Sequence, residues 1–355
     1  MKKLLFFACL ALLLTACGGN PGSSPTSASQ AAPAVNGFGT AANHVHSMLI
    51  LPDANRTLVL ATHYGIFRSQ DHGATWQETA AGPNQLMQGL MTYSLSYNTL
   101  DPQRLYVLTQ IATVPYKGIL GLYTSGDSGK TWHLSITDAS ITASSIFFAQ
   151  AGNDNPDEVY IYLRELGALG LRVSMDNGLH FSQAGGTLPF SSLLGLLVVP
   201  GEPGHLLAYG DGGIANTTDG GYHWQVVKNI QGSIFEMTTP GAGNVIYASG
   251  DAGIYASRDS GKSFKLVYTQ HSYSSLSASP QQPEVLYGKL GLGVYRSADG
   301  GQSWSKLPAI KGNLQVLIAD PGDTEQVYLA ISYPSEVYHF QAERKAWQSI
   351  TPPAA

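Results

Sequence analysis

Ser297-Ala-Asp299-Gly-Gly301-Gln-Ser-Trp304 is the last of six well-kept copies of one octapeptide, and these copies decide the fold. Each copy has Ser or Thr in first place, Asp in third, Gly in fifth and Trp or Phe in eighth. The earlier copies begin at Ser69, Ser125, Ser174, Thr217 and Ser257. Self-similar segments at regular spacing indicate that one structural unit is repeated along the chain.

A seventh, eroded copy occupies residues 340–347, where Ala342 and Arg344 replace the Asp and the Gly. Short apolar stretches precede each copy, and a further short stretch follows its aromatic residue. In the sixth repeat the preceding stretches are residues 276–279, 285–287 and 293–297. This spacing predicts four antiparallel strands per repeat, named A to D in chain order. Seven such repeats predict an all-β, seven-bladed β-propeller with the octapeptides in the turns between strands C and D.

We expect the octapeptides to have a structural role. Their carboxylates can accept hydrogen bonds from the backbone of the turn, and their glycines can adopt positive φ. The aromatic side chain would enter the apolar layer between strands or blades. The aspartates with this expected role are Asp71, Asp127, Asp176, Asp219, Asp259 and Asp299.

The N-terminus has the features of a secretory signal. Lys2 and Lys3 precede an apolar stretch, Leu4 to Leu14, that is too short to span a bilayer. The next residues, Leu14-Thr15-Ala16-Cys17, resemble a bacterial lipobox, which implies cleavage before Cys17 and acylation of that cysteine. An ordinary signal peptide that ends in Ala-Cys is the alternative. The lipobox resemblance implies an extracytoplasmic protein of the bacterial cell envelope that a lipid anchor holds on a membrane.

Composition divides the chain into four parts. Residues 18–42 are rich in Gly, Ser, Pro and Ala and carry no charge, which predicts a flexible tether. We therefore expect a signal peptide over residues 1–16 and a lipidated cysteine with its tether over residues 17–42. The propeller is expected over residues 43–351, followed by a short tail over residues 352–355.

Charge and cysteine content exclude several functions. The formal net charge is −5, and it becomes −7 when the two lysines of the signal are removed. No basic run is present, so the sequence argues against nucleic acid as a partner. Cys9 lies in the signal, so the mature chain keeps Cys17 alone and cannot form an intrachain disulfide. We expect a monomer that is stabilised by packing.

Strand order predicts which loops form the ligand face. In a four-stranded meander, the B–C loops and the D–A links lie on one face and the C–D turns on the other. Ligands of propellers usually bind on the face of the B–C loops, which we call the ligand face. His44 and His46 begin strand A of blade 1, and His63 and Tyr64 end its strand B. If residue 46 pairs with residue 63, three imidazoles meet there and could hold a divalent metal or a sugar. The alternative is a set of hydrogen-bonded histidines that close the ring between the first and last blades.

Several charged residues on the same face are candidates for catalysis or binding. Asp211 and Asp251 occupy matching B–C positions, and Glu236 lies inside strand A of blade 5. Arg164 and Glu165 lie in an elongated B–C connection of blade 3. A carboxylate pair that uses Glu165 or Glu236 would suit glycoside hydrolysis. The alternative for the two aspartates is a role in the hairpin turn, where Asp followed by small residues is common.

The octapeptide resembles the Asp box of bacterial neuraminidase repeats, and we use the name Asp box for the six copies. Sialidases clamp the substrate carboxylate with three arginines and carry a Phe/Tyr-Arg-Ile-Pro motif. This chain lacks that tetrapeptide, and only Arg164 of its eight arginines falls on the ligand face. The residues therefore argue against a true sialidase.

His44-Val-His46 and Ala61-Thr-His63-Tyr-Gly-Ile-Phe67 are similar to the opening blade of small bacterial Asp-box lipoproteins. Members of that group are described as glycosyl hydrolase-like or as similar to the photosystem II assembly factor propeller. The resemblance implies an extracytoplasmic propeller that binds a glycan or a protein ligand. The alternative is a glycoside hydrolase that uses carboxylates at the channel mouth.

Overall fold

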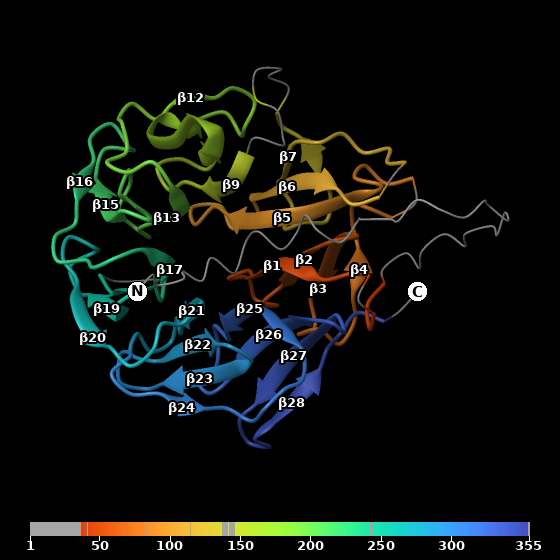
Figure 1. The fold of residues 1–355 in the computed structure, drawn as a ribbon. Helices are drawn as coiled ribbons and strands as arrows, with labels where there is room; N and C mark the ends of the chain where they lie inside the picture. The colour runs from red at the N-terminus through yellow and green to blue at the C-terminus, as the bar shows by residue number, and fades with distance from the viewer. Residues whose placement is uncertain are drawn as a thin grey trace, which may run out of the picture. The chain divides into compact units, whose positions relative to one another are not determined.

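The computed structural model describes residues 37–40, 42–82, 84–113, 115–136, 141, 146–241 and 244–353. These residues belong to one compact unit and form seven four-stranded antiparallel sheets, each a meander in chain order. Figure 1 shows the sheets as blades around a common centre. The innermost strands of successive blades contact each other, and those of blades 1 and 7 close the ring. The predicted seven-bladed propeller with four antiparallel strands per blade is confirmed.

Each blade contributes one strand of each kind. The inner A strands are β1 (Val45–Ile50), β5 (Leu90–Tyr97), β9 (Ile146–Ala151), β13 (Leu193–Val198), β17 (Ile234–Thr238), β21 (Ser275–Ala278) and β25 (Asn313–Ala319). The B strands are β2 (Leu58–Thr62), β6 (Leu105–Ile111), β10 (Val159–Leu163), β14 (Leu206–Gly210), β18 (Ile246–Gly250), β22 (Leu286–Leu290) and β26 (Val327–Ser332).

The two outer strands of each blade follow. The C strands are β3 (Gly65–Ser69), β7 (Leu122–Ser125), β11 (Leu171–Ser174), β15 (Gly213–Thr217), β19 (Gly253–Ser257), β23 (Gly293–Ser297) and β27 (Glu336–Gln341). The D strands are β4 (Gln77–Glu78), β8 (His133–Leu134), β12 (Ser182–Gln183), β16 (Gln225–Val226), β20 (Lys265–Tyr268), β24 (Ser305–Lys306) and β28 (Ala346–Ser349).

Burial depends on the position of a strand within its blade. Every residue of the B strands β2, β10, β14 and β18 is buried. The D strands β12, β16 and β24 lie at the rim and are exposed throughout. Neighbouring blades cover both faces of a B strand, which explains why these strands are continuous apolar runs in the sequence.

The described residues form seven hydrophobic clusters, each of which lies between two neighbouring blades. The aromatic residue at the end of an octapeptide belongs to each cluster or packs against it, in contact with the preceding blade. In order of blade, these residues are Trp76, Trp132, Phe181, Trp224, Phe264, Trp304 and Trp347. The repeat motif therefore supplies one anchor for each interface, and the eroded seventh copy keeps its tryptophan.

The aspartate of each Asp box is occupied by its own turn. In blade 1, Asp71 accepts hydrogen bonds from the Ser69 hydroxyl at 2.7 Å and from the Thr75 amide at 2.8 Å. Hydrogen bonds from Thr75 and Ser69 lower the pKa of Asp71 to about 2. Gly73 has φ of +88°, a conformation that favours glycine. The same hydrogen bonds from the first residue of the box recur at Asp127, Asp176, Asp219, Asp259 and Asp299.

Noncovalent contacts alone close the ring, because blades 1 and 7 each take all four strands from one continuous segment. The Trp76 indole N–H donates to the Ile350 carbonyl at 2.7 Å. Ser335 exchanges two backbone hydrogen bonds with the chain at Gly39 and Thr40, at 2.8 and 2.9 Å. Arg56 and Asp320 form an ion pair at 3.4 Å. Blade 1 is thereby held to blade 7 at three separate places.

The packed region begins before the predicted boundary at residue 43. Phe38 is only 2% exposed and meets the Phe67 ring edge-on, with 5.1 Å between the centroids. Composition alone placed residue 38 in the tether, because one aromatic residue does not change the character of a Gly- and Ala-rich segment. The structure therefore adds the end of the predicted tether to the propeller.

The predicted signal peptide, Cys17 and most of the predicted tether lie outside the described residues. Within the described part of the chain, no helix has both the length and the apolar character that crossing a membrane requires.

Candidate functional site

A bulge at the start of the inner strands sets the geometry of the ligand face. In β1, Val45 pairs with Thr62 and Ser47 pairs with Ala61, so His46 has no partner. Four other A strands have one unpaired residue at the corresponding place, namely Phe147, Leu194, Phe235 and Gln315. A bulge releases its side chain from the strict alternation of a strand and redirects it. Five of the seven blades therefore present one bulge residue where the D–A link enters the A strand.

The three predicted histidines come together at blade 1. The His63 amide donates to the His44 carbonyl at 3.0 Å, so His63 lies opposite His44 and not opposite His46 as the sequence suggested. The bulge nevertheless brings the His46 ring to 4.5 Å from that of His44 and to 5.9 Å from that of His63, measured between centroids. The rings of His44 and His63 are stacked at 5.0 Å.

Each ring of this histidine cluster has one buried nitrogen without a hydrogen-bond partner among the described residues. One nitrogen from each residue can be chosen so that all three lie within 4.8 Å of one another. Nδ1 of His44, Nε2 of His46 and Nδ1 of His63 are buried and have no hydrogen-bond partner among the described residues. If the histidines served only to close the ring, these nitrogens would be expected to have hydrogen-bond partners. Buried polar atoms without partners are uncommon in folded proteins and call for a specific explanation.

The environment keeps the imidazoles neutral. Burial lowers the pKa of His46 to about 3, and the neighbouring His44 and His63 add to this effect. Burial and the proximity of His44 lower the pKa of His63 to about 4. Burial also lowers the pKa of His44. All three side chains are therefore uncharged at pH 7, the form in which imidazole binds metal ions.

Two tyrosines border the cluster. The Tyr64 ring meets that of His63 edge-on, with 4.8 Å between centroids. The Tyr333 ring, from the B–C loop of blade 7, is stacked on His44 at 6.4 Å. Tyr333 is 60% exposed, so it forms the solvent-facing edge of the cluster. The sequence indicated Tyr64 but not Tyr333, because the contact of blade 7 with blade 1 is made only when the ring closes.

The predicted acidic candidates occupy different environments. Asp251 is exposed, and its carboxylate accepts a hydrogen bond from the Ser233 amide at 2.8 Å, which holds the adjoining loop. Asp211 and Glu165 are also exposed. Glu165 lies on a 3-10 helix, η3 (Arg164–Leu169), where the sequence predicted a loop. The Arg164 guanidinium lies 3.4 Å from the centroid of the Phe147 ring, so a cation–π contact positions it.

Glu236 is an acid whose ionisation the fold perturbs strongly. It lies in β17 directly after the bulge residue Phe235. Its side chain is half-buried by exposed area, but protein surrounds the carboxyl group, and this burial raises its pKa to about 8. Burial raises the pKa of Tyr209 in the preceding blade, and its proximity to Glu236 adds to this effect. Glu236 is therefore protonated at neutral pH and can act as a hydrogen-bond donor or an acid.

Glu78 is a second perturbed acid, and sequence reasoning missed it. Its Oε1 atom is buried without a hydrogen-bond partner among the described residues, and burial raises the pKa of the carboxyl to about 7. No local pattern marks it, because Glu78 is simply the second residue after Trp76 in a short outer strand.

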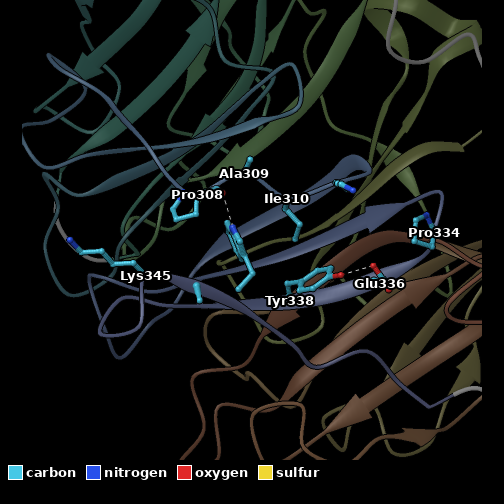
Figure 2. Close-up of a pocket in the computed structure, with 10 residues that line it drawn as sticks. Pro308, Ala309, Ile310, Pro334, Glu336, Tyr338 and Lys345 are labelled. Carbon is cyan, nitrogen blue, oxygen red and sulfur yellow. Dashed lines mark hydrogen bonds between the residues drawn. The ribbon is translucent and has the colours of Figure 1, made fainter.

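A groove of about 630 Å³ lies along blade 7, and its lining includes Pro334, the residue after Tyr333. Figure 2 shows Pro308, Ala309 and Ile310 from the link between blades 6 and 7 along it, with Tyr338 and Glu336 of β27. The Tyr338 hydroxyl donates to the Glu336 carboxylate at 2.5 Å. The groove adds apolar surface but no group of catalytic residues.

Comparison with known proteins identifies the fold and no family. No family model matches the sequence, and no curated protein matches it. A GH74 xyloglucanase from Xanthomonas campestris superimposes with a TM-score of 0.68 at 15% identity, over 90% of this chain and 55% of that one. A GH74 enzyme from Niastella koreensis gives a TM-score of 0.69 at 15% identity, over 90% and 55%. This chain thus spans about half the length of those enzymes.

A second kind of propeller is also similar. YCF48 from Cyanidioschyzon merolae superimposes with a TM-score of 0.59 at 14% identity, over 84% of this chain and 97% of that one. A structure of YCF48 bound to D1 peptide gives a TM-score of 0.56 at 12% identity, over 86% and 93%. At such identities the likeness concerns the fold, and propellers of one fold perform unrelated functions.

Proposed function

We propose that the protein is an extracytoplasmic, lipid-anchored propeller that binds a glycan or protein ligand on the face opposite the Asp boxes. The observation that carries this proposal is the histidine cluster at blade 1, which has a buried, unpartnered nitrogen on each ring. Atoms in such a state lose hydrogen bonds to water and gain none in the fold, unless a ligand supplies them. Tyr333, exposed and stacked on His44, is the edge from which a ligand would reach the cluster.

The six Asp boxes provide no competing site. Each of their carboxylates is already bonded to its own turn. The known propellers of similar fold include one solved with a bound peptide, and this agrees with a binding role without identifying the ligand.

A glycoside hydrolase is the second candidate, and Glu236 favours it. Glycosidases need one carboxyl group that stays protonated near neutral pH and a second carboxylate on the other side of the scissile bond. Glu236, with its pKa raised to about 8 by burial, suits the first role. Asp211, Asp251 and Glu165 are the candidates for the second, and Asp251 is the weakest, because its carboxylate already holds a loop.

One experiment separates the two functions. The mature full chain would be screened on a glycan array and a peptide array, and in parallel against a broad panel of glycosides. For a binding module, we expect His46→Ala to abolish ligand binding and Glu236→Gln to retain it, with no sugar released by either protein. Sugar release that disappears in Glu236→Gln would replace the binding module with the hydrolase.

The anchor has its own test. We expect the wild-type protein to enter the detergent phase of a Triton X-114 separation and Cys17→Ser to stay in the aqueous phase, because one residue carries the acyl chains. The melting temperature should be the same for both proteins, since Cys17 precedes the packed region. Cys9→Ser, within the predicted signal, is the matched control and should partition as wild type. Equal partitioning of Cys17→Ser and wild type would contradict the lipid anchor.

A further inference from the structure

We propose that His44, His46 and His63 bind one divalent transition-metal ion, for which Zn²⁺ is the best fit. His46 lies in β1, His44 directly precedes that strand, and His63 directly follows its partner β2. The hydrogen bond from the His63 amide to the His44 carbonyl fixes the backbones at these strand ends. A site built on paired strands holds its ligands more accurately than a site built on loops. The proposal rests on the proposed function and deepens it, because the glycan or protein ligand would bind directly to the ion.

The distances suit a zinc ion after a small adjustment. Imidazole nitrogens bind Zn²⁺ at about 2.0–2.1 Å, so two ligands of a tetrahedral site lie about 3.4 Å apart. The three candidate nitrogens already lie within 4.8 Å of one another. Rotations of the imidazole rings would close the remaining gap without movement of the strands.

A structural histidine in the same chain shows the contrast. His205 is 1% exposed, and both of its ring nitrogens have partners. Nδ1 lies 2.8 Å from the Glu202 carboxylate and Nε2 lies 3.1 Å from the Asn216 side chain. The fold can therefore satisfy a buried histidine where the role is packing. At blade 1 it instead turns three neutral rings toward one another and leaves a nitrogen of each without a partner.

Charge and ligand number define what the ion would do. Among the described residues no Asp, Glu or Cys joins the three histidines. Three neutral ligands leave the full double positive charge on the ion, and a zinc site with three protein ligands keeps a position open for another. An anionic or hydroxyl oxygen of the proposed ligand fits that position. Ca²⁺ and Mg²⁺ do not suit the site, since they require oxygen ligands.

Metal binding can be measured without any assay of activity. The mature full chain would be freed of metal with EDTA, dialysed, and titrated with ZnCl₂ by isothermal calorimetry, with MgCl₂ as the comparison. We expect one equivalent of Zn²⁺ and no response to Mg²⁺. Co²⁺ bound in place of Zn²⁺ should give the visible absorption bands of a tetrahedral site.

Two variants and a control assign the ligands. We expect His46→Gln and His63→Gln to weaken Zn²⁺ binding by more than the roughly 10- to 100-fold that loss of an outer-shell partner causes. His133→Ala, an exposed histidine of the outer strand β8, should bind Zn²⁺ as wild type. Circular dichroism of each protein checks that it is folded. A folded wild-type chain without saturable Zn²⁺ binding would overturn the proposal, and so would equal affinity in both glutamine variants and wild type.

The outcomes also separate the ion from the proposed function. Zn²⁺ binding that the variants abolish, in a protein that binds no glycan or peptide, would support the metal site and reject the ligand-binding function. Ligand binding that survives EDTA in a chain that takes up no Zn²⁺ would retain the function and reject the metal site.

Discussion

Trp76→Ala should lower the free energy of unfolding by about 3 kcal/mol, the lower end of the usual cost of removing a large aromatic side chain from a core, because Trp76 is half-buried. Trp76 packs in the cluster between blades 7 and 1, where its indole also donates to the Ile350 carbonyl. Every other pair of neighbouring blades is joined by the chain itself, whereas this pair is held by contacts alone. Loss of the side chain therefore weakens the one interface that has no covalent link.

The measurement is denaturant unfolding of the full chain, followed by tryptophan fluorescence and by circular dichroism. Trp76→Phe is the matched control, because Phe181 and Phe264 occupy the same place in blades 3 and 5. That variant keeps a ring in the cluster but loses the hydrogen bond, so we expect a loss of only about 1 kcal/mol. Trp76→Ala with a stability like that of Trp76→Phe would show that other contacts are sufficient to close the ring.

Glu236→Gln should stabilise the protein at pH 8 and leave its stability unchanged at pH 4. Burial raises the pKa of Glu236 to about 8 in the folded state from its ordinary value of 4.5. Below pH 4.5 the carboxyl is protonated in both states and contributes no pH dependence. Between pH 4.5 and 8 only the unfolded state loses the proton, so unfolding becomes more favourable as the pH rises.

Glutamine is neutral at every pH and has nearly the shape of protonated glutamate, so it removes this effect. One pKa unit corresponds to about 1.4 kcal/mol. The Glu236 side chain is only half-buried by exposed area, so solvent screening reduces the full effect and we expect a gain of about 2 to 4 kcal/mol at pH 8. Melting temperatures from pH 4 to 9 would be compared with those of Glu165→Gln, an exposed control on the same face. Parallel curves for Glu236→Gln and wild type would show that Glu236 is ionised in the folded protein.

Repetition made the fold predictable from local patterns. The octapeptide ending in Trp304 carries a turn, a required glycine and an aromatic anchor within eight residues, and each of these acts on neighbouring residues or on the preceding blade. Because the pattern recurs with little change, strand number, strand order and blade number follow from spacing alone. The start of the packed region at Phe38 did not follow, because that contact is made with Phe67, which lies 29 residues later in β3.

The candidate site depended on long-range geometry. The sequence placed His44, His46 and His63 on adjacent strands of one blade, since strand position is a local property. Which histidines face each other was decided by a bulge at His46 that shifts the pairing, and a single extra residue leaves no mark in an apolar strand pattern. The raised pKa values of Glu236 and Glu78 also depend on the tertiary structure, because burial causes both shifts. Desolvation of a carboxyl group depends on residues brought near it by the fold from other parts of the chain, so only the tertiary structure determines it.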